Sequence, residues 1–168
     1  ADHAKVALLS KGPLLSGSTY WAQGGIAAAM DPNDHPSQHA QDTYTAGAQC
    51  NHMDTVHMVT AQAPEMIKWL IGQGVAFHHN KDGTLHLGQE GGHNRRRIVH
   101  AADATGKAIA STLIKNIQSL PIDTFEYTTA IDLIEHNKQC IGLYALNHHT
   151  GKVDTFSAKI VVLATGGA

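Results

Sequence analysis

The chain has 168 residues, enough for one domain with a core, and its 42% hydrophobic and 15% charged residues fit a globular protein. Its 12 basic residues nearly balance its 14 acidic ones, which argues against a nucleic acid or a membrane as partner. No apolar run approaches the ~20 residues of a membrane span, no signal peptide is evident and no CxxC motif occurs, so we expect a cytoplasmic protein without disulfides.

The first predicted element is a buried parallel strand. Residues 5–10 are mostly apolar, and the Lys-Gly-Pro sequence at residues 11–13 supplies its exit turn. A polar loop with two prolines follows at residues 31–36. Ser37 is then placed to cap a helix over residues 38–46.

Between this strand and this loop, residues 16–29 combine hydroxyl, aromatic and amide side chains with a Gly-Gly step. Because Gly24 and Gly25 have no Cβ, the backbone there is able to lie directly against a flat or anionic ligand. Ser18 or Thr19 is suited to cap a short helix whose free N–H groups face a phosphate. The alternative is a glycine loop that leads into an alanine-rich helix.

Asn51 is expected to cap a second helical region, which Pro64 should kink or split and Gly72 or Gly74 should end. The inward face of this region carries apolar residues at helical spacing: Val56, Val59, Ala63, Ile67, Leu70 and Ile71. Other large apolar residues of this region are interpreted as core and not as a cofactor-binding set: Met58, Met66 and Trp69.

Regular structure becomes sparse between residues 77 and 100. Asp82-Gly83 is a turn signal of the hairpin type, and residues 90–97 form a second Gly-Gly site that is dense in charge. Thr105 is expected to cap a helix over residues 106–119. The apolar residues of this helix that should face inward are Ile109, Leu113, Ile114 and Ile117.

The remainder of the chain has the pattern of strands. Residues 124–135, 140–146 and 153–157 predict an antiparallel meander, and residues 159–165 predict a second buried strand that leads into a third Gly-Gly site. The order of elements indicates an α/β fold with α+β character, without internal repeats or linkers.

The 13 histidines do not form an HExxH motif or a cluster at zinc-finger spacing, so we expect exposed histidines and no metal site. The run Arg95–Arg97 is either a solvated charged face or a binding site for a carboxylate. A nucleophilic hydrolase is disfavoured because a GxSxG motif is absent.

The three Gly-Gly sites are expected to surround one extended ligand: residues 24–25, 91–92 and 166–167. The chain contains no GxGxxG motif. If a dinucleotide binds, we therefore expect its pyrophosphate-binding turn upstream of Ala1.

Several segments resemble the L-aspartate oxidase family, which lies within the superfamily of succinate dehydrogenase and fumarate reductase flavoproteins. The resemblance extends in order along nearly the whole chain, and the segment EGGHNRRRIVHAADATG at residues 90–106 is its most specific part. The other segments that carry it are residues 10–13 (SKGP), 17–28 (GSTYWAQGGIAA), 69–75 (WLIGQGV) and 158–168 (AKIVVLATGGA).

This resemblance implies a partial Rossmann-like FAD-binding domain with parallel strands, several helices and a small antiparallel β-meander. Residues 1–168 would form one such domain, incomplete at both ends. Its first βα unit, with the GxGxxG motif, would lie upstream, and a capping domain and a helical C-terminal domain would lie downstream.

The resemblance also implies FAD as a non-covalent cofactor, because Ser18 stands where related enzymes carry a histidine that bonds to the flavin. Lys11 would lie near the adenosine end, and the stretch beginning at Ser18 would surround the pyrophosphate and the flavin ring. The full set of implied cofactor residues is Lys11, Ser18, Thr19, Tyr20, Trp21, Ala22, Gln23, Gly24, Gly25, Ala130, Ile131, Ala164, Thr165, Gly166 and Gly167.

The implied reaction is oxidation of L-aspartate to iminoaspartate, with O2 or fumarate as acceptor, in the first step of NAD biosynthesis through quinolinate. Glu90 would pair with the substrate ammonium group, since a buried glutamate without a cation would cost several kcal/mol. The alternative for Glu90 is a salt bridge to the Arg95–Arg97 run. The main catalytic arginine and histidines are expected beyond Ala168, so these residues alone should be inactive.

Three other functions stay open from the sequence: a soluble fumarate reductase or succinate dehydrogenase-like flavoprotein, a flavin-free structural fragment, and a histidine-rich metal-binding module. The expected partners are small molecules, namely L-aspartate with fumarate or O2, and association with the quinolinate synthase of the same pathway is a further expectation. The sequence does not indicate an oligomeric state.

Overall fold

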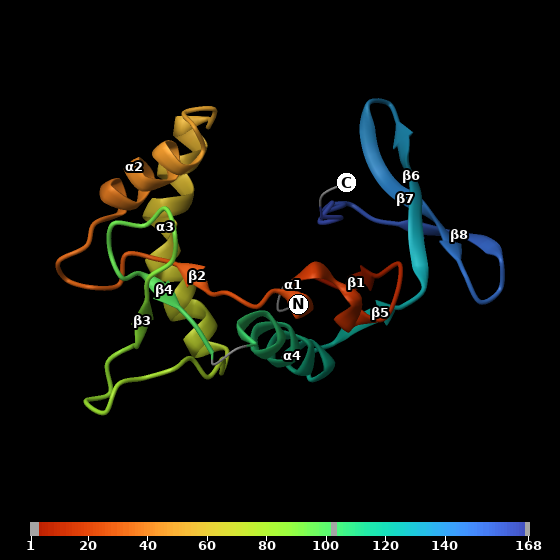
Figure 1. Cartoon of the computed structure of the whole chain (residues 1–168). Helices are drawn as coiled ribbons and strands as arrows, with labels where there is room; N and C mark the ends of the chain where they lie inside the picture. Colours follow the sequence, from red (N-terminus) through yellow and green to blue (C-terminus); the bar gives the residue numbers. More distant parts are fainter. Residues whose placement is uncertain (1–3, 102–103, 167–168) are drawn as a thin grey trace. The chain divides into compact units, whose positions relative to one another are not determined.

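A computed structural model of the chain describes residues 4–101 and 104–166 (Figure 1). The chain forms two compact units. Unit 1 consists of residues 1–16 and 117–168, and unit 2 consists of residues 17–116.

Unit 2 combines helices with a small antiparallel sheet of strand order β2-β4-β3. In this unit α2 runs alongside the longer α3 (Figure 1). The elements are α1 (Ser18–Trp21), β2 (Ile26–Ala27), α2 (Pro36–Ala46), α3 (Met53–Gly72), β3 (Leu87–Gly88), β4 (Ile98–Val99) and α4 (Thr105–Gln118), of which α4 ends in unit 1.

The core of unit 2 lies between α3, α4 and the small sheet. Ile67 of α3 and Val99 of β4 are completely buried, and Ile109 of α4 packs in the same cluster. The buried members of this cluster are Ala28, Ile67, Leu70, Val75, Phe77, Val99 and Ile109.

Helix α3 differs from its prediction at two points. It continues through Pro64 as one element of 20 residues, and it has His52 in place of Asn51 as its N-cap, whereas its end at Gly72 is as predicted. Proline removes one main-chain hydrogen bond, whereas the next turn buries Ile67 and Leu70, and this burial outweighs the loss.

The outer face of α3 was predicted to be core, and this prediction is wrong. Met58 and Met66 are each 51% exposed, Trp69 is 49% exposed, and Val59 and Ile71 are also exposed. Helical spacing reports an apolar side of a helix, but only the packed neighbours decide which part of that side is buried.

Two predicted caps are also wrong. Gly17 is the N-cap of α1 and makes no side-chain cap bond, so neither Ser18 nor Thr19 caps this helix. His35 caps α2 through Nδ1, which accepts from the N–H of Ser37 at 3.2 Å. Because Pro36 starts the helix two residues earlier than expected, Ser37 already lies inside it.

Unit 1 contains a parallel strand pair and an antiparallel meander. Its elements are β1 (Val6–Leu9), a 3-10 turn η1 (Leu14–Ser16), β5 (Ile122–Phe125), β6 (Thr128–His136), β7 (Gln139–Asn147) and β8 (Lys152–Ser157). Strand β1 pairs in parallel with β5, from Val6 opposite Ile122 to Leu9 opposite Phe125. The predicted parallel strand is confirmed, but it is only partly buried because this sheet has two strands.

The predicted meander is confirmed in the order β6-β7-β8. Asn137 and Lys138 turn between β6 and β7 with φ of 51° and 63°, as a type I′ hairpin requires. The first predicted strand is divided, because Tyr127 with φ of 52° separates β5 from β6. The parallel pair, the helices and the meander together confirm the α/β class with α+β character.

The predicted buried strand over residues 159–165 is wrong. These residues are irregular, Ile160 is 79% exposed and Val162 is 81% exposed. Apolar residues form a buried strand only beside a pairing partner, and none pairs with this segment in the described part of unit 1. No helix among the described residues is long and apolar enough to cross a membrane.

Candidate functional site

The candidate site is a hollow of about 460 Å3 in unit 2, which we call the Glu90 hollow. It lies where β3 and β4 meet the Gly-Gly step at residues 24–25. The residues that line it are Gln23, Gly24, Gly88, Gln89, Glu90, Ile98 and His100. Of the three predicted Gly-Gly sites, Gly24 of the first lines the hollow, and Glu90, which directly precedes the second, lines it as well.

Close packing explains the glycine at position 25. A Cβ on Gly25 would lie 2.5 Å from the carbonyl oxygen of Val99 and would overlap the Cγ2 methyl of Ile98. Residues 26 and 27 continue as strand β2, which pairs with β4. The alternative of an alanine-rich helix after the Gly-Gly step is therefore wrong.

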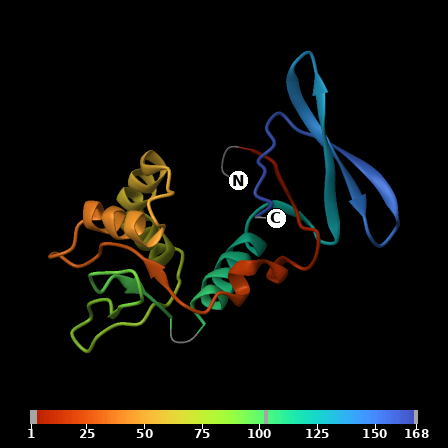
Figure 2. The same cartoon turned by 45° about the horizontal axis from the view of Figure 1, so that its top comes forward.

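The first residues of α4 are hydrogen-bonded to residues 22–24, which lead into the Gly-Gly step. Thr105 lies within α4, and its hydroxyl donates to the carbonyl oxygen of Gly24 at 2.7 Å and accepts from the N–H of Ala101 at 3.1 Å. Gly106 donates its N–H to the carbonyl oxygen of Ala22 at 3.1 Å, and a Cβ there would collide with the carbonyl oxygen of Thr19. Figure 2 shows the resulting contact of α1 with α4. The sequence predicted Thr105 as a cap and did not predict this role.

Glu90 presents its carboxylate to the hollow. Its Oε1 lies 3.3 Å from the position that a Cβ on Gly24 would occupy. Glu90 is exposed, so the expected cost of burying it does not arise in this chain. It takes part in no ion pair among the described residues, which contradicts the alternative of a salt bridge to the Arg95–Arg97 run.

Arg97 has a structural role instead. It is completely buried, and its guanidinium donates to Asp34 at 2.8 and 2.9 Å and to Asp42 at 2.7 Å. Asn94 donates its main-chain N–H and its side-chain amide to the same Asp42 carboxylate, at 2.9 and 2.6 Å. Arg97 is therefore not part of a solvated face, and its guanidinium is occupied by the chain's own carboxylates rather than by a ligand.

The pKa of Asp42 reflects this setting. Burial alone would raise the pKa of this carboxyl, but the hydrogen bonds from Asn94 and Arg97 and the charge of Arg97 lower it overall. Asp42 therefore carries its negative charge at neutral pH and compensates the buried guanidinium.

The two other arginines of the run make weaker contacts. Arg96 donates from Nε to the carbonyl oxygen of Leu87 at 3.0 Å, and Arg95 donates to Gln38 at 3.4 Å. Both side chains are exposed. For these two residues, the prediction of a solvated face is confirmed.

His39 lies beside the buried Arg97. It is 7% exposed, and its Nδ1 has no hydrogen-bond partner in the part of the chain that the structure describes. Burial first, and then the charges of Arg97 and His93, lower the pKa of His39. The prediction of exposed histidines is wrong here, and His39 is held neutral in the folded chain.

Three further histidines form a cluster at the edge of the Glu90 hollow. Nδ1 of His86 lies 2.8 Å from Nε2 of His100, and the ring of His78 stacks on that of His100 at 5.6 Å. His86 and His100 are half-buried, so the prediction of exposed histidines fails for them as well. Across residues 4–101 and 104–166 no group of histidine, cysteine and acidic side chains is arranged to hold a metal ion.

The remaining predicted cofactor residues outside residues 18–25 belong to unit 1. Lys11 is exposed after β1, and Ala130 and Ile131 are exposed in β6, where the pairing with β7 shifts register. Residues 164–166 are exposed and irregular, and Gly167 lies outside the described residues. The prediction that all of these residues surround one ligand stays a prediction.

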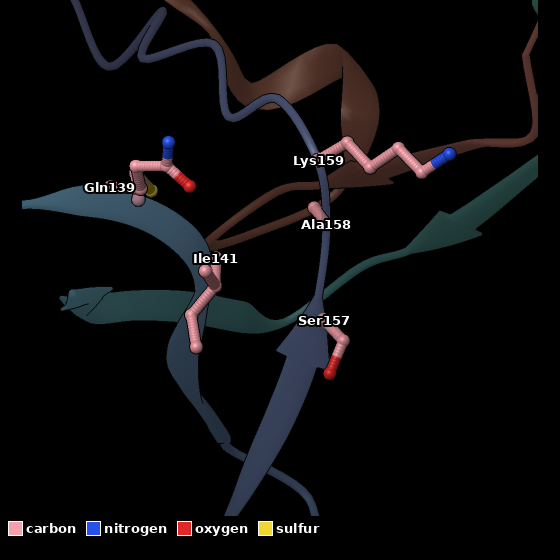
Figure 3. A pocket seen from close by; sticks show the side chains of 6 residues that line it. Gln139, Ile141, Ser157, Ala158 and Lys159 are labelled. Carbon is pink, nitrogen blue, oxygen red and sulfur yellow. The ribbon is translucent and has the colours of Figure 1, made fainter. Parts of the chain in front are cut away.

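Unit 1 contains a second hollow, of about 490 Å3, between the start of β7 and the end of β8 (Figure 3). Its lining residues are Gln139, Cys140, Ile141, Ser157, Ala158 and Lys159. None of the predicted site residues lines it.

Comparisons with known proteins agree with the predicted family. A family model described as FAD binding domain matches residues 1–168. An L-aspartate oxidase of Pseudomonas aeruginosa is 45% identical over 99% of this chain and 34% of its own length. An L-aspartate oxidase of Yersinia pestis is 46% identical over the whole chain and 34% of its own length. The chain thus spans about a third of the length of these curated relatives.

Solved structures show the same fold. A quinol fumarate reductase of E. coli superposes with a TM-score of 0.90 at 31% identity, over 99% of this chain and 29% of that chain. The Mycobacterium smegmatis Sdh1 complex superposes with a TM-score of 0.89 at 30% identity, over 97% of this chain and 30% of that chain.

Proposed function

The chain belongs to the FAD-binding domain family, and from this premise we propose that it is part of an FAD-dependent L-aspartate oxidase. FAD is the cofactor of this family. The proposed reaction oxidises L-aspartate to iminoaspartate and passes the electrons to O2 or fumarate. The names and identities of the curated relatives support this assignment over the whole of the chain.

The residues of the Glu90 hollow fit a flavin by their own chemistry. Gly24 leaves its main chain open toward Glu90, because no Cβ fills the space between them. The side-chain amides of Gln23 and Gln89 each offer donor and acceptor atoms, which suit the polar edge of a flavin ring. When bound, FAD supplies the electron-accepting ring, and the chain supplies position and electrostatics.

The observation that carries the choice of substrate is the carboxylate of Glu90. It faces the hollow and has no cationic partner among the residues that the structure describes. An ammonium group is the complementary ligand for such a carboxylate, whereas the dicarboxylate succinate would be repelled. In this proposal Glu90 binds the amine of L-aspartate and orients the carbon atom that is oxidised.

The runner-up is a soluble fumarate reductase or succinate dehydrogenase-like flavoprotein. The TM-score of 0.90 with the quinol fumarate reductase of E. coli favours it, since the two chains share the fold along 99% of this chain. The free carboxylate of Glu90 disfavours it, because succinate and fumarate, unlike L-aspartate, have no ammonium group to offset a third carboxylate near their own two.

The remaining parts of the proposal follow from the resemblance. We propose a non-covalent flavin, because Ser18 cannot form a histidyl bond, and acid precipitation of the protein should release all of it. A place in NAD biosynthesis, association with quinolinate synthase and a cytoplasmic location complete the proposal.

The test uses the full-length protein that contains this chain. Under air, we expect it to produce hydrogen peroxide from L-aspartate and none from succinate. The variant Glu90→Gln should lower kcat/KM for L-aspartate by about 10- to 100-fold, because a hydrogen bond to a charged group contributes about 1.5–3 kcal/mol. Fumarate reduction by the same variant should change little.

Glu65→Gln is the matched control, since it also neutralises a glutamate but in an exposed pair with Lys68 on α3. It should leave both activities unchanged. Peroxide from succinate alone would refute the assignment in favour of the runner-up. A full-length protein that is colourless and takes up no added FAD would support the flavin-free alternative.

A further inference from the structure

The inference concerns His100, which lines the Glu90 hollow directly after strand β4. Its main-chain carbonyl accepts from the N–H of His78 at 2.8 Å, so the loop before β3 is attached to it. The N–H of His86 donates in turn to the carbonyl oxygen of His78 at 2.9 Å. The turn at Asp82-Gly83 thus places His78 and His86 next to His100.

The three imidazoles are in mutual contact. Rings of His86 and His100 are perpendicular, at 85° with centroids 5.0 Å apart, which suits a hydrogen bond between their nitrogens. His78 lies nearly parallel to His100, at 11°, and nearly perpendicular to His86, at 82°. These contacts leave His100 little freedom to rotate away from His86.

One proton is shared between the 2.8 Å pair, Nδ1 of His86 and Nε2 of His100. If His100 donates it, Nδ1 of His100 is left as a base. If His86 donates it, Nδ1 of His100 carries a proton. The direction of this single hydrogen bond therefore decides whether His100 accepts or supplies a proton at its other nitrogen.

We propose that His100 exchanges a proton with the ligand in the Glu90 hollow, and that His86 positions His100 and carries the proton onward. This inference rests on the proposed amine substrate, because oxidation of an amine requires the ammonium group to lose a proton. In this proposal Glu90 binds the ammonium group of the substrate, and His100 and His86 remove a proton from it.

The transfer balances over the two rings. A proton passes from the ligand ammonium group to Nδ1 of His100, while the proton on Nε2 of His100 crosses to Nδ1 of His86. Nε2 of His86 then releases its proton to water. Each ring gains and loses one proton, so both stay neutral and exchange tautomers.

The surroundings of His86 favour its neutral ring. Burial first, and then the charges of His100, His78 and Arg96, lower the pKa of His86. A neutral pair is the state in which a proton is able to move from one ring to the other.

The experiment compares two substitutions at His86 in the full-length protein. His86→Asn retains an amide that is able to hydrogen-bond to His100 but cannot relay a proton, and His86→Leu removes both functions. His79→Asn is the control, since the Nδ1 of His79 lies 2.8 Å from the carbonyl oxygen of Phe77 and not against the cluster.

The first readout is the pH titration of the imidazole nitrogens by NMR after selective ¹⁵N-histidine labelling. We expect His86 and His100 to titrate as a coupled pair in the wild-type protein and in His79→Asn, and His100 to titrate in a single step in His86→Asn. Independent titration of the two rings in the wild-type protein would overturn the proposal.

The second readout is L-aspartate oxidation. His86→Asn should lower kcat by about tenfold or more while KM changes little, and added imidazole should restore part of the loss. An unchanged kcat and pH profile in both His86 variants would refute the relay alone. Absence of L-aspartate oxidation in the wild-type protein would refute the proposed function and the relay together.

Discussion

The two units of this chain reach regular structure in different ways. Unit 2 buries a cluster around Ile67 and Val99 and encloses the Arg97 guanidinium with two carboxylates. Unit 1 forms well-paired strands, yet Ile131 and Val153 on those strands are exposed. Main-chain hydrogen bonds suffice to define strands, whereas burial of side chains is what stabilises a unit against unfolding.

The residues predicted to bind the cofactor also differ between the units. In unit 2, Gly24 of the Glu90 hollow accepts a hydrogen bond from Thr105, and the nearby Ala22 accepts one from Gly106. In unit 1 the predicted cofactor residues Lys11 and Ile131 are exposed and lack comparable support. We conclude that the Glu90 hollow of unit 2 is preorganised.

The largest expected loss of stability comes from a substitution among the buried charges of unit 2. Asp42→Asn should destabilise this unit by about 3–5 kcal/mol, because it leaves the buried Arg97 short of one carboxylate. Native-state hydrogen exchange at the amides of Ile98 and Val99 would measure this loss.

The matched variant lies in unit 1, where Lys5 and Asp123 form an exposed pair at 3.7 Å. Asp123→Asn should cost no more than about 1 kcal/mol, since water and salt screen the pair. Equal losses in the two variants would contradict the difference between the units.

A second comparison tests the apolar residues. Val99→Ala should destabilise unit 2 by about 2 kcal/mol, because Val99 is completely buried. Val162→Ala in the irregular segment of unit 1 should change stability by less than about 0.5 kcal/mol, because this side chain is exposed. Urea unfolding of the two variants would measure both values, and a larger effect at Val162 would show that it packs in the native protein.

The smallest expected effect is the contribution of His39 to the pH dependence of the free energy of unfolding. Because the folded pKa of His39 is lowered from 6.5, the unfolded chain binds a proton more readily as the pH falls below 6.5. The free energy of unfolding should therefore decrease with acidification, by at most about 1.4 kcal/mol per pH unit for this group. Above pH 6.5 His39 should have no influence.

Urea unfolding at pH 7.5 and pH 5.5 would measure this change, with His39→Gln as the comparison. The variant should lose part of the pH dependence between these values. An identical pH dependence in the variant would show that other groups cause it.

Local patterns predicted much of the fold. The helix expected over residues 106–119 is α4, the turn at Asn137-Lys138 joins β6 to β7, and the strand at residues 5–10 is β1. Each of these features depends on neighbours within a few positions of the chain. The burial of Met66 and the strand at residues 159–165 were predicted wrongly, because burial and strand pairing depend on partners elsewhere in the structure.

The candidate site divides in a similar way. Glu90 and Gly24 were identified as site residues from the sequence, and they line one hollow. The ion pairs of Arg97 with Asp34 and Asp42 join positions 63 and 55 residues apart, respectively. No local pattern relates such positions, so the sequence left the role of Arg97 open.

The sequence by itself determined the family, the order of elements and the residues that carry chemistry, because motifs and turn residues act through local backbone geometry and through resemblance. Only the tertiary structure decided that Arg97 is buried, that His86 and His100 are hydrogen-bonded to each other, and that Glu90 has no cationic partner in the described chain. These properties depend on distances between atoms that the fold brings together, and charge interactions and hydrogen bonds act over a few ångströms of space.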